Sequence, residues 1–443
     1  MRTSLAPLGE RNFRLLFCAQ AIWLLGSWMT PVALAFAVLS LTDSPSALGL
    51  VLGAEAVPLT LLLLVGGVWA DRLPRVRVMV TADLVSVVSQ GTTAVLLIAG
   101  SAEVWQLVAL AAVAGAADAF HTPAWAGLLP ETVPPPMLQR ANALRHLESN
   151  AGRVAGPLLA GVIIAAAGAG WAIAADALSF LLAAAILVRV DVPARAVAGQ
   201  AASFVAELKE GWRAVRAESW LIVMMIDTGL WMLVIWGPYA VLGPIVCERE
   251  LGGAGSWALI SAGYGLGSIG GGVLGLRLHP RRPLLVAIVI NAVFLPLLAS
   301  LAVASPAWTI AAMAVPAGAS TSLYMVLWDT TLQERVPREA LARVSSFERI
   351  SVFAPLPIGM ALAGPVAQWI GVEETLWVSA AWLGVSTVFL LSIPSIRRME
   401  RPAHDPLLLG SHDVRHPAPL GPDDRRDDGQ RDHDGRHGHL LPE

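Results

Sequence analysis

Long apolar segments recur twelve times along this chain, and that pattern leaves very few folds open to it. A helix needs about 20 mostly apolar residues to cross a bilayer, because each residue adds about 1.5 Å. Only 14 % of the 443 residues are charged, too few to cover a soluble enzyme of this length. The runs are too long for barrel strands, so we predict an all-α membrane protein. The predicted spans are roughly 15–41, 47–70, 78–99, 104–122, 147–169, 171–190, 219–241, 255–276, 283–304, 307–328, 350–371 and 375–394.

Arginine residues alternate between the two sides of these predicted spans. They precede span 1 and fill every even-to-odd connection, whereas the other loops hold only Arg249. Positively charged loops stay on the cytoplasmic side, so we predict a multi-pass protein of the cell (plasma) membrane with both termini cytoplasmic. Tryptophan, which favours the headgroup layer, opens five spans at the predicted outer face. These residues are Trp105, Trp171, Trp257, Trp308 and Trp377.

An internal repeat divides the chain into halves. Residues 125–140 resemble residues 328–343 at a constant offset of 203, so that Trp125 matches Trp328 and Glu131 matches Glu334. The offset continues into the next helix, where Gly156 and Gly161 match Gly359 and Gly364. Parallel structural repeats with a substrate site between them are typical of secondary transporters.

Composition then predicts four segments. We expect a six-helix bundle over 1–190, a cytoplasmic linker over 191–218, a second six-helix bundle over 219–395 and a disordered cytoplasmic tail over 396–443. The linker run AELKEGWRAVRAE fits either a short interfacial amphipathic helix or a plain solvated connection. The tail is rich in Pro, Gly, Asp, Arg and His, which favours disorder. We expect a monomer that needs no cofactor, no metal and no nucleic acid.

The loop between spans 2 and 3 reads GGVWADRLPRVRV. A carboxylate at a helix end can pair with arginine and hold two helices together, and a small residue allows close helix approach. The loop resembles the signature loop of the major facilitator superfamily, with Pro74 in place of a second glycine. That resemblance implies twelve helices in two pseudo-symmetric six-helix bundles, and a latch for the outward-open state. The matching positions are Gly67, Asp71, Arg72, Arg75 and Arg77.

Span 5 carries small residues at helical spacing around a proline. Gly152, Gly156, Pro157 and Gly161 resemble the Gly-Pro motif of drug–proton antiporters, although simple close packing is the alternative interpretation. The run AGAADAFHTPAWAGLLPETVP and the segments that follow resemble the enterobactin-exporter-like branch, which includes multidrug and macrolide efflux proteins. Span 4 lacks the arginine that many proton-coupled members carry there, a departure from their pattern.

Ionisable side chains inside a bilayer are costly and mark functional sites. Family architecture implies that spans 1, 4, 7 and 10 line the cavity, which ranks Asp118 and Asp227 first as carriers of a proton or a cationic substrate. Glu55 is a further candidate, with a solvated vestibule position as its alternative. Arg153 needs a partner, and a permanent pair with Asp118 would make both structural. Asp83 and Asp176 lie on peripheral spans, and we expect both to have structural roles.

Aromatic residues on the implied cavity helices complete the candidate site. Trp28, Trp231 and Tyr324 are candidates for an amphipathic substrate surface. We predict a secondary active transporter, not an enzyme, that exports a small hydrophobic or cationic compound (a drug, macrolide or siderophore) in exchange for protons by alternating access. A lipid flippase or facilitated uptake carrier is an alternative. A non-cycling membrane sensor is an alternative of another class.

Overall fold

A computed structural model describes residues 6–192, 212–213, 215–216, 218–336 and 338–401. These residues form helices and turns without any strand, and they include twelve helical spans long and apolar enough to cross a membrane. The predicted all-α membrane fold is therefore confirmed. Most of the linker predicted over 191–218, and the tail from 402, lie outside the described residues.

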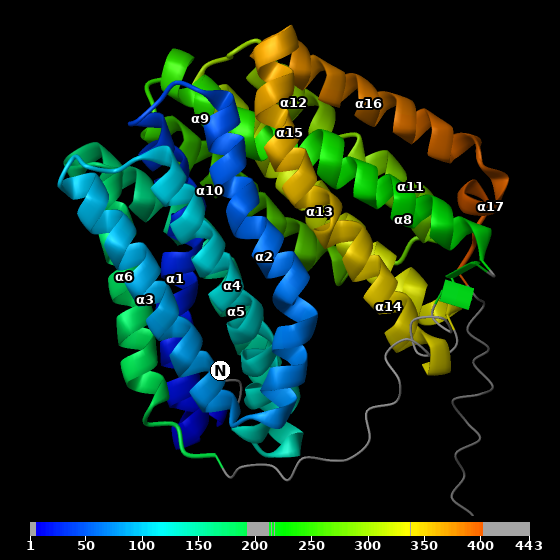
Figure 1. Ribbon diagram of the computed structural model, residues 1–443. Coiled ribbons are helices and arrows are strands. Elements are labelled where there is room, and N and C mark those ends of the chain that lie inside the picture. Colours follow the sequence, from blue (N-terminus) through cyan, green and yellow to red (C-terminus); the bar gives the residue numbers. More distant parts are fainter. Residues whose placement is uncertain (1–5, 193–211, 214, 217, 337, 402–443) are drawn as a thin grey trace, which may run out of the picture. The chain divides into compact units, whose positions relative to one another are not determined.

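Six helices build the first half (Figure 1). They are α1 (Arg11–Leu39), α2 (Pro45–Arg72), α3 (Arg75–Ile98), α4 (Val104–Leu128), α5 (Leu138–Ala167) and α6 (Ala169–Leu187). Within this half α1 packs on α5 and α6, α2 packs on α4, and α3 packs on both α4 and α6. Helix α5 begins nine residues before the predicted span, because hydropathy marks the apolar stretch and not the polar turns that extend it.

The second half divides its six spans among more helical pieces. Span 7 consists of α8 (Ser219–Trp231), a π-helical turn η4 (Met232–Trp236) and α9 (Gly237–Glu250). Spans 8, 9 and 10 are α10 (Ala254–Gly275), the pair α11 (Pro283–Asn291) and α12 (Phe294–Ala302), and α13 (Ala307–Arg335). Spans 11 and 12 are α14 (Arg338–Phe353) with α15 (Pro355–Ile370), and α16 (Val372–Ser392), which a short α17 (Pro394–Arg397) follows.

The two ends of the helices differ in charge. We call the end where α1, α3 and α5 begin the arginine-rich end, and the end where α2, α4 and α6 begin the opposite end. Four of the five predicted tryptophan anchors at the opposite end are exposed, as a headgroup position requires. Trp257 is the exception and corrects that expectation. It is buried, with its ring centroid 5.2 Å from that of Tyr239.

The halves meet through two helix pairs that the internal repeat relates. Helix α5 packs on α10, and its repeat counterpart α15 packs on α2. Gly161 faces Ala258 in the first pair, and Gly364 faces the Pro45 backbone in the second. Each glycine lets two backbones approach closely, which is the usual role of small residues between membrane helices. The glycines matched by the 203-residue offset thus occupy equivalent crossings.

A methyl group at Gly364 is expected to force the α2–α15 crossing apart. Its Cβ would lie inside van der Waals contact with the Pro45 carbonyl oxygen, which belongs to backbone and cannot rotate away. We expect Gly364→Ala to cost about 1–3 kcal/mol of stability, the usual range for overpacking. Gly384→Ala is the matched control, because nothing lies within 4 Å of a Cβ at that site in α16. Thermal unfolding of the purified chain in detergent measures both, and equal midpoints would contradict the crossing.

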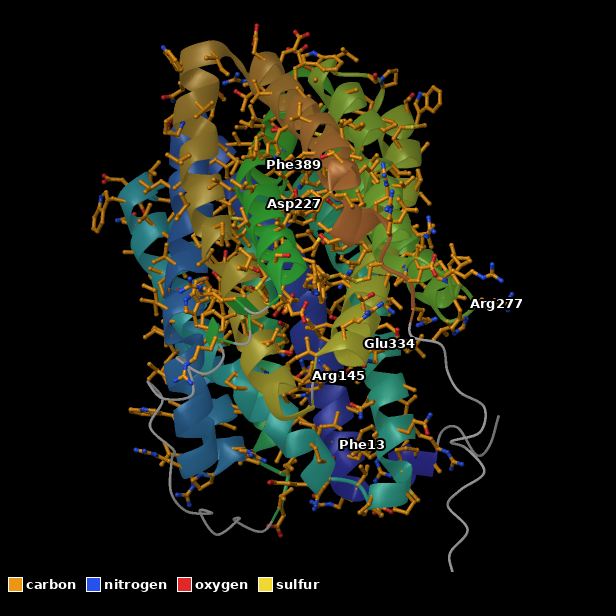
Figure 2. All side chains as sticks on the ribbon, turned by 90° about the vertical axis from the view of Figure 1, so that its right-hand side faces the viewer. Phe13, Arg145, Asp227, Arg277, Glu334 and Phe389 are labelled. Carbon is orange, nitrogen blue, oxygen red and sulfur yellow. The ribbon has the colours of Figure 1, made fainter. Side chains whose placement is uncertain are left out.

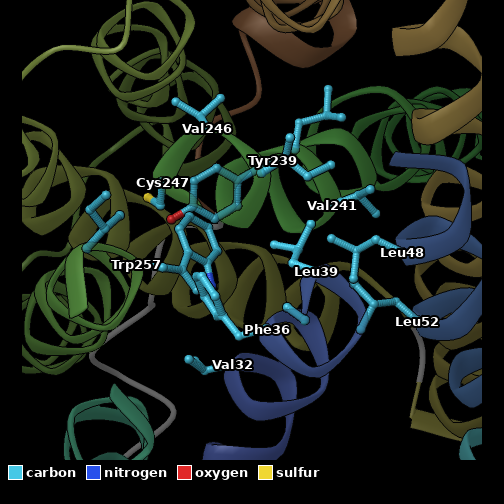
Figure 3. Packing of buried hydrophobic residues seen from close by; sticks show 14 of the residues in the cluster. Val32, Phe36, Leu39, Leu48, Leu52, Tyr239, Val241, Val246, Cys247 and Trp257 are labelled. Atoms are coloured by element: carbon cyan, nitrogen blue, oxygen red, sulfur yellow. The ribbon is translucent and has the colours of Figure 1, made fainter. Parts of the chain in front are cut away.

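Buried apolar residues join the halves at one end only. At the opposite end, a single cluster includes Leu39 of α1, Leu48 of α2 and Val241 of α9 (Figure 3). At the arginine-rich end the cores are separate, one around Phe13 in the first half and one around Trp220 in the second. In the described residues the halves therefore share their core at the opposite end and have separate cores at the arginine-rich end.

The predicted tail boundary at residue 396 is wrong. Ile396 is fully buried in the core of the second half, and the Arg401 Nε donates to Glu334 Oε1 at 2.8 Å. The low-complexity composition begins after this segment. Six residues of the predicted tail, 396–401, therefore belong to the folded part of the chain, because one apolar and one charged side chain attach them.

Candidate functional site

A small pocket in the second half brings together three of the predicted residues. Asp227 and Trp231 from α8 and Tyr324 from α13 line it (Figure 2 labels Asp227). Asp227 supplies a carboxylate, while the two rings supply flat apolar surface with polar edges. The arrangement suits a hydrophobic cation, which pairs with the carboxylate and stacks on the rings. The other lining residues are Thr228, Met232, Asn291, Thr321 and Met325.

The π-helical turn η4 follows directly after Trp231. Such turns are rare and frequently occur at functional sites, because the inserted residue redirects the side chains around it. The Trp231 ring stacks on Trp236 at 5.9 Å and meets Phe294 edge-on at 5.5 Å. Its indole Nε1 is buried and has no hydrogen-bond partner in the described part of the chain. This donor is available to a ligand.

Acidic side chains cluster inside the first half. Helices α2 and α4 pack so closely that Gly115 of α4 touches the Glu55 backbone, one turn before Asp118. Asp118 lies within electrostatic range of Glu55, Asp83 and Asp176. Among the described residues, no lysine or arginine forms an ion pair with any of these four carboxylates. The first half thus concentrates carboxyl groups near Asp118.

Asp176 of α6 is fully buried and ties three helices together. Its Oδ2 accepts from the Thr30 hydroxyl of α1 at 2.7 Å and from the Gln90 amide of α3 at 3.1 Å. Ser179, on its own helix, lies within 3.5 Å of Oδ1. Donors from separate helices satisfy this carboxylate, which supports the structural role proposed for it. Thr30 and Gln90 carried no signal in the sequence beyond being polar.

Arg153 of α5 stacks on an aromatic ring and forms no ion pair with Asp118 or Glu148 in the described structure. Its guanidinium lies 4.9 Å from the Trp28 ring centroid, and its buried Nε has no hydrogen-bond partner among the described residues. Gly152 and Gly156 make room for Trp28, since a Cβ at either would clash with that side chain. The glycines of the span 5 motif therefore position Trp28 under Arg153, while Pro157 is buried beside them.

A histidine that the sequence analysis passed over lies beside Asp83. His121 Nδ1 is 2.8 Å from Asp83 Oδ1, and both side chains are almost fully buried. Trp23 of α1 stacks on the imidazole with ring centroids 4.4 Å apart. The sequence feature that could have indicated His121 is its position three residues after Asp118 on the same helix. A single histidine in an apolar span is by itself a weak indication.

Glu148 of α5 occupies a second small pocket, near the arginine-rich end. Its buried Oε1 has no hydrogen-bond partner in the described residues, and Arg145, one turn away, lies over the Trp125 ring at 4.4 Å. Phe13 of α1 lines the same pocket (Figure 2 labels Phe13 and Arg145). The Arg145 guanidinium in this pocket therefore packs against the face of the Trp125 ring.

The signature loop attaches to the end of α4. Arg75 Nη1 donates to the Gly127 carbonyl at 2.6 Å and to Glu131 Oε1 at 2.7 Å. Arg72 and Arg77 are exposed, and the surroundings of Gly67 and of the Asp71 side chain lie outside what the structure describes. The sequence repeat singled out Glu131, but it did not predict that Glu131 accepts a hydrogen bond from Arg75. Its counterpart Glu334 accepts from Arg401 instead.

We expect the Arg75–Glu131 pair to contribute more than an exposed pair. Its side chains are 18 % and 22 % exposed, against 45 % and 62 % for Arg282–Glu400. A double-mutant cycle of Arg75→Gln and Glu131→Gln should give a coupling energy of about 1 kcal/mol, at the upper end for partly exposed pairs. The same cycle on Arg282 and Glu400 is the control and should give almost none. Equal coupling energies from denaturant unfolding would contradict the stronger contribution expected of the Arg75–Glu131 pair.

Comparison with known proteins decides the family. Residues 2–413 match the model of the transmembrane secretion effector family. The chain belongs to this family. It is a multi-pass membrane transporter of the major facilitator type and not an enzyme, as predicted.

Two relatives illustrate the range of the family. The multidrug efflux pump Tap of Mycolicibacterium fortuitum is 28 % identical over 395 residues, covering 85 % of this chain and 94 % of the relative. The macrolide efflux protein A of Streptococcus pyogenes is 24 % identical over 396 residues, covering 88 % and 97 %. Both are transporters by name, and both align along almost their whole length.

Solved structures agree on the fold. A bacterial homolog of the human lysosomal transporter Spinster, in an inward-facing and unoccupied conformation, superposes with a TM-score of 0.66. It is 16 % identical and covers 86 % of this chain and 96 % of its own. At that identity the likeness supports the major facilitator fold, in which two pseudo-symmetric six-helix bundles face each other.

Proposed function

We propose that this family member exports a small hydrophobic or cationic compound, such as a drug or macrolide, in exchange for protons. The observation that carries the proposal is the pocket in which Asp227, Trp231 and Tyr324 converge. A carboxylate beside aromatic rings recognises an organic cation without demanding one particular shape. The relatives named for multidrug and macrolide efflux support the same class of substrate.

The proposed exchange relies on buried carboxylates. Asp227 in the second half and Asp118 with Glu55 in the first half are acids inside membrane spans, where a charge without a partner is costly. A proton or a cationic substrate relieves that cost, and only one of them is needed at a time. Competition between the two for the same negative charge gives antiport.

The cycle we propose is alternating access, with the two halves tilting about a site near the middle of the membrane. The shared core at the opposite end and the separate cores at the arginine-rich end support an inward-facing arrangement for the described state. In this proposal the arginine-rich end and both termini are cytoplasmic, by the positive-inside rule. The protein acts in the cell (plasma) membrane as a monomer.

Transport in inverted membrane vesicles tests the proposal. We expect ethidium, and separately erythromycin, to accumulate when the lumen is acidified, and a protonophore to abolish that accumulation. Asp118→Asn should remove the dependence on the pH gradient. Asp43→Asn, at an exposed residue of the α1–α2 loop, is the control and should behave as the parent.

Four outcomes would redirect the assignment. Accumulation that survives collapse of the gradient would contradict antiport. Equilibration of the compound across the membrane without accumulation, whether or not a gradient is present, would favour a facilitated carrier. Movement of labelled phospholipid between leaflets, with neither compound transported, would favour a lipid flippase. Tight binding of either compound without any movement would favour a non-cycling membrane sensor.

A further inference from the structure

The buried pair of His121 and Asp83 has unused hydrogen-bonding capacity. Their 2.8 Å contact joins Nδ1 to Oδ1, and the side chains are 2 % and 1 % exposed. Both imidazole nitrogens of His121 and both carboxylate oxygens of Asp83 are buried, and none of the four has a hydrogen-bond partner in the described part of the chain. Buried polar atoms without partners are rare and call for an explanation. A role in binding and releasing a proton would explain why these atoms are left without partners.

Counting protons shows what the pair can do. The 2.8 Å contact between Nδ1 and Oδ1 is close enough for charge pairing but is not a well-aligned hydrogen bond. A neutral imidazole beside an ionised carboxylate carries a net charge of about −1. A second proton binds at Nε2 and gives an imidazolium beside a carboxylate, with no net charge. Burial favours the neutral pair, because a net charge in a low-dielectric interior is costly. The pair therefore binds or releases a single proton without breaking its own contact.

The surroundings of the pair are acidic. Three further carboxyl groups belong to this region: Glu55 on α2, Asp118 on α4 and Asp176 on α6. Asp118 lies within electrostatic range of the other two and of Asp83. From α1 the imidazole meets Trp23, which has no charge.

The nearby cations are committed elsewhere. Arg75 of α3 binds Glu131 and Gly127, and Arg153 of α5 lies on Trp28. An imidazolium would thus supply a positive charge beside Asp83, with which no described lysine or arginine forms an ion pair. Because His121 follows Asp118 by three residues on α4, it lies about one helical turn from the acid proposed to meet the cavity.

We propose that the Asp83–His121 pair is a proton-binding site, which takes up and releases one proton at His121 Nε2 in each transport cycle. The proposal rests on the proton-coupled export proposed above and names a residue that stores the proton. Trp23 covers one face of the imidazole from α1, while the pair itself joins α3 to α4. Trp23 is therefore the side chain that must shift before water can reach this face of the ring.

The test separates proton storage from structure with His121→Asn. The asparagine amide keeps an N–H donor for Asp83 but binds no proton at accessible pH. In proteoliposomes we expect ethidium uptake driven by a pH gradient to fall at least about tenfold, as for loss of a functional intramembrane group. Exchange of internal for external ethidium without a gradient should stay within about twofold, because no net proton moves. His146→Asn, at an exposed histidine of α5, is the control and should change neither.

A second measurement follows the proton itself. Nuclear magnetic resonance of the purified full chain with ring-labelled histidine, recorded between about pH 5 and 8, should show a buried histidine signal that changes when Nε2 binds a proton. Ethidium binding should shift the midpoint of that change, and the signal should be missing in His121→Asn. His121→Gln identifies the same signal if the asparagine variant fails to fold.

The outcomes separate this proposal from the one it rests on. A wild-type chain that moves ethidium with no link to pH would overturn the proton-coupled function. A wild-type chain with that link, beside a His121→Asn variant that keeps gradient-driven uptake, would overturn only the proton site. Loss of exchange together with driven uptake in a folded variant, or a His121 signal that stays constant over this pH range, would assign the pair a structural role instead.

Discussion

Asp227→Asn is expected to bind ethidium about ten- to a hundredfold more weakly than the parent, which corresponds to about 1.4–2.8 kcal/mol. The asparagine side chain has nearly the same shape and still lines the pocket with Trp231 and Tyr324. Only the negative charge is lost, and a charge attraction in an apolar pocket is much stronger than in water. Fluorescence titration of the purified chain with ethidium measures the change directly.

Two controls separate charge from shape at Asp227. A neutral hydrophobic dye should bind parent and variant within about twofold, because its contacts are with the rings and not with the carboxylate. Trp231→Phe should weaken both probes, since it reduces the ring surface and removes the unpartnered indole Nε1. Equal ethidium affinities of the parent and of Asp227→Asn would show that this pocket is not the cation site.

Asp176→Leu is expected to prevent stable assembly of the first half. The substitution removes the acceptor that Thr30 of α1 and Gln90 of α3 share, and it leaves the Gln90 amide buried without that partner. It also places a bulkier apolar group against Gly26, which already contacts the Asp176 carboxylate. Removing one member of a buried polar network costs about 3–5 kcal/mol, a large part of a protein's total stability.

Asp176→Asn provides the matched comparison, because its amide oxygen still accepts from Thr30 and Gln90. We expect it to fold with a loss of about 1–2 kcal/mol, since hydrogen bonds to a neutral acceptor are weaker. Asp43→Leu, at the exposed loop residue, should stay within about 0.5 kcal/mol of the parent. Detergent-extracted yield and denaturant unfolding rank the variants. Normal stability of Asp176→Leu would contradict a carboxylate that holds α1, α3 and α6 together.

The membrane spans and the division into two halves could be predicted from the sequence, because each depends on a pattern that extends over many residues. The apolar spans follow from the thickness of a bilayer, and each is visible in about 20 consecutive residues. The 203-residue repeat predicted two related halves, and the glycines that it matches, Gly161 and Gly364, lie at the two equivalent crossings between them. The family resemblance placed Asp227, Trp231 and Tyr324 on implied cavity spans 7 and 10, and these three side chains line one pocket.

Features that depend on one side chain meeting another could not be read from spacing. Arg153 was expected to find a carboxylate, yet an aromatic face lies nearer, and only packing decides between them. Trp257 has the position of a membrane anchor but turns inward to Tyr239. Arg401 follows the composition of the tail, while its guanidinium reaches Glu334 on α13. Burial and partner choice are properties of three-dimensional contacts, which a linear pattern does not contain.

The central claim is that the two halves tilt against each other as substrate and protons exchange. Two pairs of spin labels test it most directly, in a chain whose Cys18 and Cys247 are replaced by serine. One pair, Arg140→Cys with Arg277→Cys, spans the arginine-rich end, and the other, Ser101→Cys with Glu374→Cys, spans the opposite end. Pulsed electron paramagnetic resonance then gives both distances at acidic and alkaline pH, with and without ethidium.

We expect the two distances to change in opposite directions between these conditions, one end closing by several ångströms as the other opens. Distances at both ends that stay the same at every pH, with and without bound ethidium, would contradict alternating access and leave a chain that binds its ligand without cycling.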